Sequence, residues 1–256
     1  MILANNTNIS LKELTNNFQF PSNLEKQFFT RIFSTPRNVY DSRLKQINFI
    51  DKKNVLDAGC GYGQWTLSLC DFNDNVHAID LDPQKLKIAK NIISLQKKTS
   101  SFQIGRIENL PFNADEFDAV FSYSVIYWTD YKKSLKEFFR VLKSSGILYF
   151  VTNGLGWSIF NFLTAHSSTS DFNARKHALK TISETLKYSF TNKREPGQSI
   201  FMTPKNIVNY LKEIGFRKVS YAGEGHLNFN KSIKSNPFYP KKYLGFTNVF
   251  EIYAEK

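Results

Sequence analysis

The sequence predicts an α/β protein with an open, mostly parallel β-sheet. Short apolar runs alternate with segments of helical periodicity between residues 54 and 153, and a glycine-rich turn follows the first run. Alternation of this kind is typical of parallel strands joined by crossover helices. The chain has 256 residues, of which 41% are hydrophobic, so it is long and apolar enough to bury a large core.

The first part of this alternation predicts three strands. Residues 54–59 (NVLDAG) form an apolar run ending in glycine, residues 75–82 (NVHAIDLD) form a second run, and residues 101–105 (SFQIG) form a weaker third. Asp82 and Pro83 are typical of the N-cap and first turn of a helix. Apolar side chains mark the helices that follow the first two strands: Trp65, Leu67, Leu69 and Cys70, then Leu86, Ala89 and Ile93.

The second part continues the same rhythm. Residues 117–128 (FDAVFSYSVIYW) predict a strong fourth strand that runs into a loop, and residues 147–152 (ILYFVT) predict a fifth. Between them, Thr129 and Asp130 are suitable caps for a helix. The apolar positions of that helix follow at helical spacing: Leu135, Phe138, Phe139 and Leu142.

The last hundred residues are less regular. From residue 154 to 201 the rhythm breaks into a polar, basic and partly helical stretch. A helix that begins at Pro204 and stops at Gly215 restores it. Residues 216–221 and 249–253 then predict the closing strands of the sheet.

The net charge of +12 is unevenly distributed. Residues 1–53 carry 8 Lys and Arg against 4 Asp and Glu, residues 54–153 carry 11 against 11, and residues 154–256 carry 15 against 7. The middle is therefore neutral and both flanks are basic, which favours anionic partners such as phosphates, nucleic acid or acidic sugars. A compositional bias toward solvated lysines explains the same numbers, and the sequence leaves both interpretations open.

We expect a cytoplasmic protein without a membrane span. The first residues (MILANNTNIS) lack a basic region followed by a long apolar run, and no window approaches the roughly 18 apolar residues of a span. Cys60 and Cys70 match no paired metal or redox spacing, so a disulfide framework is not expected.

The glycine-rich turn indicates a ligand site at the carboxyl end of the first strand, where open α/β sheets bind their ligands. Gly59, Gly61 and Gly63 alternate with other residues there. The dinucleotide fingerprint G-x-G-x-x-G fails because Gln64 replaces its third glycine, and the phosphate-loop pattern is absent. The sequence therefore argues against a pyrophosphate ligand.

Four segments in order resemble the class I S-adenosylmethionine-dependent methyltransferases of the small-molecule, type 11 branch. They lie within about residues 50–152: DAGCGYG, AIDLDPQKLKIAKN, IGRIENLPFNADEFDAVFS and EFFRVLKSSGILYF. The resemblance implies a Rossmann-like, seven-stranded sheet with helices on both faces. It also implies an N-terminal helical arm (1–50), a cofactor-binding core (51–153 and 202–256) and a substrate cap inserted at 154–201.

S-adenosylmethionine is the cofactor that the resemblance implies. Glycine at positions 59 and 61 would leave room for its close approach. Asp80 follows the second strand, where its carboxylate can accept from both ribose hydroxyls, while Leu81 would pack on the adenine. Asp57 would order the loop below the methionine end, or serve only in structural hydrogen bonding. The cofactor-binding residues that we expect are Asp57, Gly59, Cys60, Gly61, Asp80, Leu81, Arg106, Ile107 and Ser122.

Arg106 departs from the family pattern, which commonly has an acid there to accept from the adenine amino group. An arginine offers no acceptor. Two interpretations stay open: adenine is held by stacking and by the backbone N–H of Ile107, or Arg106 turns outward.

The sequence offers few candidates for catalysis. His166, in the insertion, and Tyr127, after the fourth strand, are the expected catalytic residues. Residues 122–128 contain no acid, so we expect no metal site. Tyr40, Arg175 and Lys176 are the expected substrate-binding residues for a small anionic, phosphorylated or sugar-linked metabolite. Five other basic residues could bind the same phosphate or carboxylate group: Arg31, Arg37, Arg43, Lys193 and Arg194.

The function predicted from the sequence is metal-independent methyl transfer from S-adenosylmethionine to an oxygen or nitrogen of such a metabolite. Two alternatives remain. An RNA methyltransferase fits the positive charge, although no separate RNA-binding module is visible. A non-catalytic protein that binds S-adenosylmethionine fits the glycine turn equally well.

Overall fold

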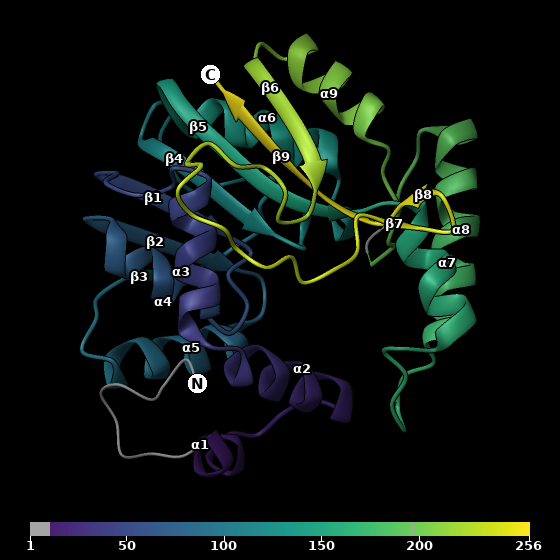
Figure 1. The fold of residues 1–256 in the computed structure, drawn as a ribbon, viewed down its shortest axis with the longest axis horizontal. Helices are drawn as coiled ribbons and strands as arrows, with labels where there is room; N and C mark the ends of the chain where they lie inside the picture. The colour runs from purple at the N-terminus through teal and green to yellow at the C-terminus, as the bar shows by residue number, and fades with distance from the viewer. Residues whose placement is uncertain (1–10, 196) are drawn as a thin grey trace.

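A seven-stranded sheet forms the centre of the protein, which we describe from a computed structural model covering residues 11–195 and 197–256 (Figure 1). The strand order is β3-β2-β1-β4-β5-β9-β6, with parallel pairing from β3 to β5 and antiparallel pairing of β9 with both neighbours. The strands are β1 (Asn54–Ala58), β2 (Asn75–Asp80), β3 (Ser101–Ile104), β4 (Phe117–Tyr123), β5 (Leu142–Asn153), β6 (Arg217–Gly223) and β9 (Val249–Glu255). The predicted fold class is confirmed.

Helices cover both faces of this sheet. Successive side chains of a strand point to opposite faces, so Tyr149 packs in the cluster that contains residues of α2, α3, α4 and α5, whereas Phe150 packs with α6 and α9. The helices among the described residues are α1 (Leu11–Asn17), α2 (Asn23–Ser34), α3 (Arg37–Gln46), α4 (Gln64–Phe72), α5 (Pro83–Leu95), α6 (Tyr131–Val141), α7 (Leu155–Thr164), α8 (Ala174–Thr191) and α9 (Pro204–Glu213).

The structure fixes the ends of two predicted strands. Residues 117–128 were predicted as a strand that runs into a loop, and β4 ends at Tyr123, because Ser124 adopts a positive φ of 61°. A short 3-10 helix (Ile126–Trp128) follows it. The fifth strand begins at Leu142 rather than after Gly146, directly at the end of α6.

The predicted N-terminal arm and the predicted cap contribute no strand to the central sheet within the described residues. The first ten residues of the predicted arm are outside the described residues, and the rest of it contains α1, α2 and α3. The segment predicted as a cap contains α7 and α8, which Figure 1 shows beside the sheet together with the hairpin of β7 (Lys242–Tyr243) and β8 (Phe246–Thr247). None of the helices within the described ranges combines the length and the hydrophobicity that a membrane span requires.

Candidate active site

The glycine turn joins β1 to α4 with three left-handed residues in alternation. Gly59, Gly61 and Gly63 have φ of +82°, +56° and +81°. A Cβ on Gly61 would meet no atom within 4 Å, whereas one on Gly59 would lie 2.5 Å from the Cγ2 atom of Val125. Gly61 therefore borders open space beside the strand ends. Gly59 does not, because a side chain there would collide with Val125.

Asp80 lies at the end of β2 and holds the glycine turn in place. Its Oδ2 accepts a 2.8 Å hydrogen bond from the Gly61 N–H, and its Oδ1 accepts one of 3.0 Å from the Asp82 N–H. Asp82 is the cap of α5, because its carboxylate accepts from the N–H groups of Gln84 and Lys85. Each oxygen of Asp80 retains a second lone pair, so the carboxylate can still accept from a ligand.

Asp57 is buried beneath the same turn. Its Oδ2 accepts a 2.6 Å hydrogen bond from the Thr66 hydroxyl of α4. The pKa of Asp57 is raised to about 7, chiefly by burial and in part by the negative charge of Asp80, while the Thr66 hydrogen bond acts in the opposite direction. Asp57 thus ties β1 to α4 under the space that Gly61 leaves open.

The side chains expected near adenine are divided between surface and core. Leu81 is 54% exposed at the end of β2, as a surface that receives a planar ring requires, and Arg106 is exposed. Ile107 has its side chain in the core, so only its backbone is available to a ligand. The contact of its N–H with adenine stays a prediction.

Cys60 and Ser122 are placed inside the protein. Cys60 is buried, and burial raises the pKa of its thiol. Ser122 is fully buried, and its hydroxyl donates to the Ala58 carbonyl at 2.8 Å. The Ser122 hydroxyl thus joins β4 to β1 below the turn, and the contact of Ser122 with the cofactor stays a prediction.

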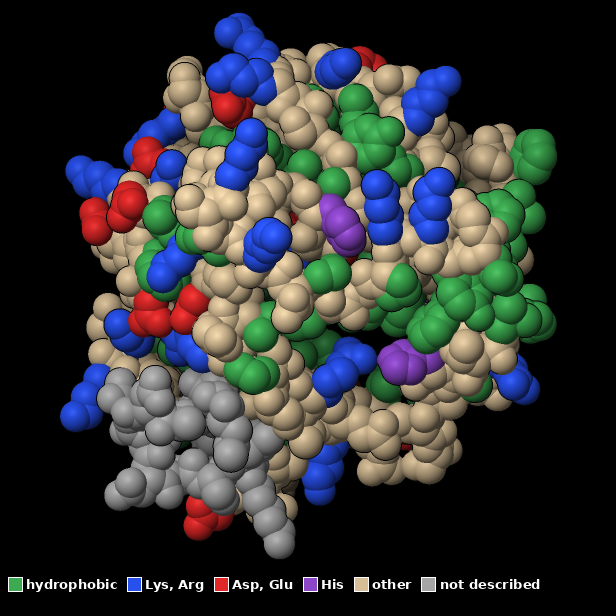
Figure 2. Space-filling view, in the orientation of Figure 1, with side chains coloured by type: hydrophobic (Ala, Val, Ile, Leu, Met, Phe, Trp, Pro, Cys, Tyr) green, Lys and Arg blue, Asp and Glu red, His purple; other side chains and the backbone are tan. Residues whose placement is uncertain are grey.

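An opening of about 450 Å³ lies along α2. Figure 2 shows this face of the molecule hollowed between α2 and the α7–α8 segment, with basic side chains and a histidine around the hollow. The arm and the insertion meet here, because Asn23 donates to the Asp171 carboxylate and the Ser170 hydroxyl, both at 2.8 Å. The opening is lined by Asn23, Lys26, Gln27, Thr30 and Arg31.

Two half-buried tyrosines, Tyr127 and Tyr239, lie close enough to Arg31 for its charge to affect them. Burial raises the pKa of Tyr127 to about 12 and also raises that of Tyr239, while the positive charge of Arg31 acts in the opposite direction on both. The ring of Tyr239 lies 5.1 Å from that of Trp157 in α7. A phenol with such a pKa keeps its proton at neutral pH, so Tyr127 can donate a hydrogen bond but is a poor general base.

The histidines of the insertion have different surroundings. His166 is exposed and lies against Phe160 of α7, with ring centroids 5.2 Å apart. His177 is half-buried, its Nε2 lies 3.4 Å from the Ser199 hydroxyl, and burial lowers its pKa. Within the described residues, no group of His, Cys, Asp and Glu side chains is arranged to hold a metal ion.

The predicted substrate cradle needs correction at Tyr40. This side chain is only 3% exposed, and its hydroxyl donates to the Ile32 carbonyl at 2.9 Å, so it belongs to the core. Arg37, Arg43 and Arg194 are likewise held by carboxylates or carbonyl groups of the protein. The other two expected residues, Arg175 and Lys176, are exposed in the first turn of α8.

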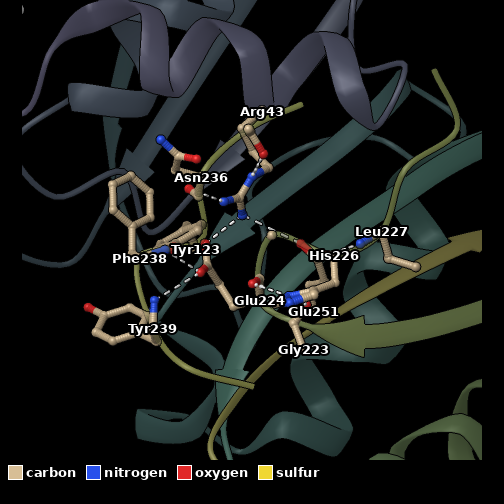
Figure 3. Close-up of polar contacts among 12 residues, drawn as sticks. Arg43, Tyr123, Gly223, Glu224, His226, Leu227, Asn236, Phe238, Tyr239 and Glu251 are labelled. Atoms are coloured by element: carbon tan, nitrogen blue, oxygen red, sulfur yellow. Dashed lines mark hydrogen bonds and ion pairs between the residues drawn. The ribbon is translucent and has the colours of Figure 1, made fainter. Parts of the chain in front are cut away.

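A buried polar network adjoins this site and was missed in the sequence (Figure 3). The guanidinium of Arg43 in α3 pairs with Glu224 at 2.5 Å and lies 3.6 Å from Glu251 of β9, and all three side chains are buried. Tyr123, at the end of β4, donates to Glu224 at 2.8 Å. The network thus joins α3, β4, β9 and the loop after β6.

Glu224 also fixes the segment that carries Tyr239. Its Oε2 accepts hydrogen bonds from the N–H groups of Phe238 and Tyr239, at 2.7 and 3.4 Å. Arg43 donates to the Asn236 carbonyl at 3.2 Å. No local pattern predicts the contacts of Arg43, because Glu224 and Asn236 lie 181 and 193 residues away from it in the sequence. An acid between two glycines (GEG, 223–225) is the one visible signal.

Comparisons with known proteins agree with this geometry. A family model described as a methyltransferase domain matches residues 56–150. An uncharacterized methyltransferase, YodH, of Bacillus subtilis is 37% identical over 94 residues, which are 37% of this chain and 40% of the relative. A malonyl-[acyl-carrier protein] O-methyltransferase of Hamiltonella defensa is 32% identical over 56% of this chain and 58% of its own length. The matches thus span about half of these relatives.

A solved structure resembles the fold of the protein over most of its length. An S-adenosylmethionine-dependent methyltransferase of Clostridium acetobutylicum superimposes with a TM-score of 0.60 and 17% identity, covering 90% of this chain and 98% of that one. The matched domain contains β1 to β5, the glycine turn and Asp80. Residues 56–150 thus match a methyltransferase domain and resemble the class I S-adenosylmethionine-dependent methyltransferases of the type 11 branch, and the fold of the whole chain is similar to theirs.

Proposed function

We propose that this protein binds S-adenosylmethionine across the glycine turn and transfers its methyl group to an oxygen or nitrogen of a small anionic metabolite in the cytoplasm. One observation carries the proposal. The open space at Gly61 lies directly beside a carboxylate, Asp80, at the carboxyl ends of β1 and β2. This pairing provides room for a nucleoside and an acceptor for its ribose hydroxyls.

Different residues would bind different parts of the cofactor. Asp80 accepts from the ribose, the exposed Leu81 covers the adenine, and Asp57 keeps the turn ordered through Thr66. When bound, S-adenosylmethionine supplies a methyl group that is already activated by its sulfonium. The enzyme therefore needs chiefly to align the acceptor and exclude water.

The substrate contacts are proposed on α2 rather than on the core tyrosine of the sequence prediction. Lys26 and Arg31 line the opening, and both attract carboxylates or phosphates. Tyr127 keeps its proton and can donate to an acceptor, while the exposed His166 can receive a proton. The Hamiltonella defensa relative is named as an O-methyltransferase, which supports an oxygen acceptor.

Incubation with labelled S-adenosylmethionine tests this function. The protein is offered fractionated cell metabolites, with and without ribonuclease, and Asp80→Ala serves as the control with weakened cofactor binding. We expect label in a small acidic product that ribonuclease does not destroy. Label lost to ribonuclease would establish RNA as the substrate, and cofactor binding without any transfer would establish a non-catalytic role.

Charge variants then locate the anion. Arg31→Gln should raise the substrate KM about tenfold, as expected for one lost charge-assisted hydrogen bond, while cofactor affinity stays unchanged. The double variant Arg175→Glu and Lys176→Glu tests the cradle expected from the sequence in the same assay. Lys90→Gln, on the exposed side of α5, is the matched control. If only the double variant in α8 raises the KM, the anionic group of the substrate binds at α8 rather than at α2.

A further inference from the structure

Exposed large hydrophobic side chains gather on one side of the protein, over α7, α8 and the β7–β8 hairpin. Figure 2 shows them as a green area at the right-hand edge, where Figure 1 places these elements. Residues of α7 pack against α8 and against both strands of the hairpin. The main contributors are Phe162 and Leu163 of α7, Leu179, Leu186 and Phe190 of α8, and Leu244 at the hairpin turn.

The apolar side chains of α8 form a stripe. Leu179, Leu186 and Phe190 are spaced by seven and four residues, so they share one face of the helix. They are 53%, 54% and 87% exposed, whereas the opposite face, including Ala178 and Thr181, is buried. Isolated exposed leucines need no explanation, but a row of them on one helix face indicates a surface that binds something.

Lysines run beside this stripe. Lys176, Lys180 and Lys187 are spaced by four and seven residues and occupy a neighbouring line on the exposed side of α8. Lys180 and Lys187 approach Glu184 and Glu195 at 3.5 and 3.6 Å, but exposed pairs of this kind are weak and leave the ammonium groups free to exchange partners.

Charge decides between the possible occupants of this surface. In a symmetric dimer, the same patch would face itself and bring the lysines of two copies together. Each copy also carries a net charge of +12, which opposes self-association further. An apolar stripe flanked by lysines instead matches a surface that is apolar below and negatively charged above, which describes an anionic lipid bilayer.

The geometry points to the α7–α8 face with the β7–β8 hairpin as a docking surface for anionic membranes. The leucine and phenylalanine side chains insert among the lipid chains at the interface, and the lysines contact lipid phosphates. Docking requires no membrane span, since the helices lie in the plane of the surface. The inference goes beyond the proposed methyl transfer and does not depend on it.

Vesicle flotation of the full-length protein tests the inference. We expect the protein to float with vesicles of phosphatidylcholine mixed with phosphatidylglycerol, and not with vesicles of phosphatidylcholine alone. Salt should weaken the binding, because screening shortens the range of the lysine charges. In a parallel arm, inorganic phosphate that replaces chloride at constant ionic strength should leave flotation unchanged, which distinguishes a bilayer from a site for free phosphate.

Paired variants assign the effect to this face. Leu186→Ser with Phe190→Ser, and separately Lys180→Glu with Lys187→Glu, should each lower the fraction bound by about tenfold or more. The matched controls are Tyr221→Ser, an exposed aromatic on β6, and Lys87→Glu with Lys90→Glu on α5. All seven positions are exposed, so the variants should fold normally, which circular dichroism checks.

Three results would overturn the inference. The first is absence of flotation with anionic vesicles, and the second is equal flotation of the α8 variants and their controls. The third comes from light scattering: a dimer of the wild-type protein that Leu186→Ser with Phe190→Ser dissolves would show that a second copy covers this face instead.

Discussion

The two regions proposed to bind the cofactor and the substrate, called below the cofactor side and the substrate side, are built in different ways. On the cofactor side, the contacts of Gly61, Asp80 and Thr66 join residues at most 19 positions apart. On the substrate side, Arg43 and Glu224 are 181 positions apart, and Asn23 reaches Asp171 across 148. One side is thus specified by a local motif and the other only by the completed fold. We therefore expect variants on the substrate side to lose mainly stability, and variants on the cofactor side to lose mainly affinity for S-adenosylmethionine.

The largest effect is expected from Arg43→Met, on the substrate side. The variant leaves Glu224 and Glu251 buried without their cation, and breaking a buried pair in this way costs about 3–5 kcal/mol. Urea denaturation should show this loss in the free energy of unfolding. Where the variant remains folded, calorimetry should find nearly normal affinity for S-adenosylmethionine, because the glycine turn is not part of the network.

Lys218→Met is the matched control, since it breaks an ion pair with Glu255 in which the lysine is largely exposed. Its cost should be below about 1 kcal/mol. Equal costs for the two variants would show that the buried network does not hold the substrate side together.

A comparison of two glycines sharpens the account of the cofactor side. Gly61 and Gly197 both have positive φ, and a Cβ on either would meet no atom within 4 Å. Alanine at either position should therefore cost the same backbone strain, about 1–2 kcal/mol. Only Gly61→Ala should lower the affinity for S-adenosylmethionine, by about tenfold or more, as measured by calorimetry. Equal affinities in the two variants would show that Gly61 does not face the ligand.

Asp57 should give the cofactor side a pH dependence. The folded protein holds the pKa of Asp57 at about 7, above the ordinary value of 3.8, so the unfolded chain releases this proton at lower pH. The contribution of Asp57 to the free energy of unfolding is therefore largest below about pH 4, falls as the pH rises to about 7 and is constant above it. Denaturation of Asp57→Asn across this range should lack that decrease.

Asp118→Asn provides the control of opposite sign. The pKa of Asp118 is lowered, because hydrogen bonds from Lys143 and the Asn54 N–H outweigh its partial burial. Its contribution to stability is present at neutral pH and is lost as the pH falls through the folded pKa. If the contributions of Asp57 and Asp118 to the free energy of unfolding both fell in the same direction of pH change, burial would not be the cause of the raised pKa of Asp57.

The sequence was a good guide wherever one segment carried its own signal. Pro83 predicted the start of α5, and the alternation of apolar runs and helical segments from Asn54 to Asn153 predicted the helices and strands in their order along the chain. Asp80 and Gly61 were predicted as neighbours at the strand ends, and their hydrogen bond joins them there. These features follow from local propensity and from the rule that parallel strands share their carboxyl ends.

Side-chain roles on the substrate side were not accessible in this way. Tyr40 looked like a substrate ligand because it lies among arginines in the sequence, yet packing against Trp65 and Phe238 places it in the core. Glu224 has no neighbour in the sequence that reveals its partner, since Arg43 approaches it only after the sheet has formed. Pairing of this kind depends on tertiary contacts, which a single sequence does not display.

The most direct measurement is calorimetric titration of S-adenosylmethionine into the wild-type protein, Asp80→Ala and Asp82→Ala. We predict that Asp80→Ala lowers the affinity by about tenfold or more, as expected for the loss of a charged acceptor. Asp82→Ala, which removes the cap of α5, should cost about 1 kcal/mol of stability but leave the affinity nearly unchanged. Unchanged affinity in Asp80→Ala would contradict the account, because the cofactor would then lie elsewhere.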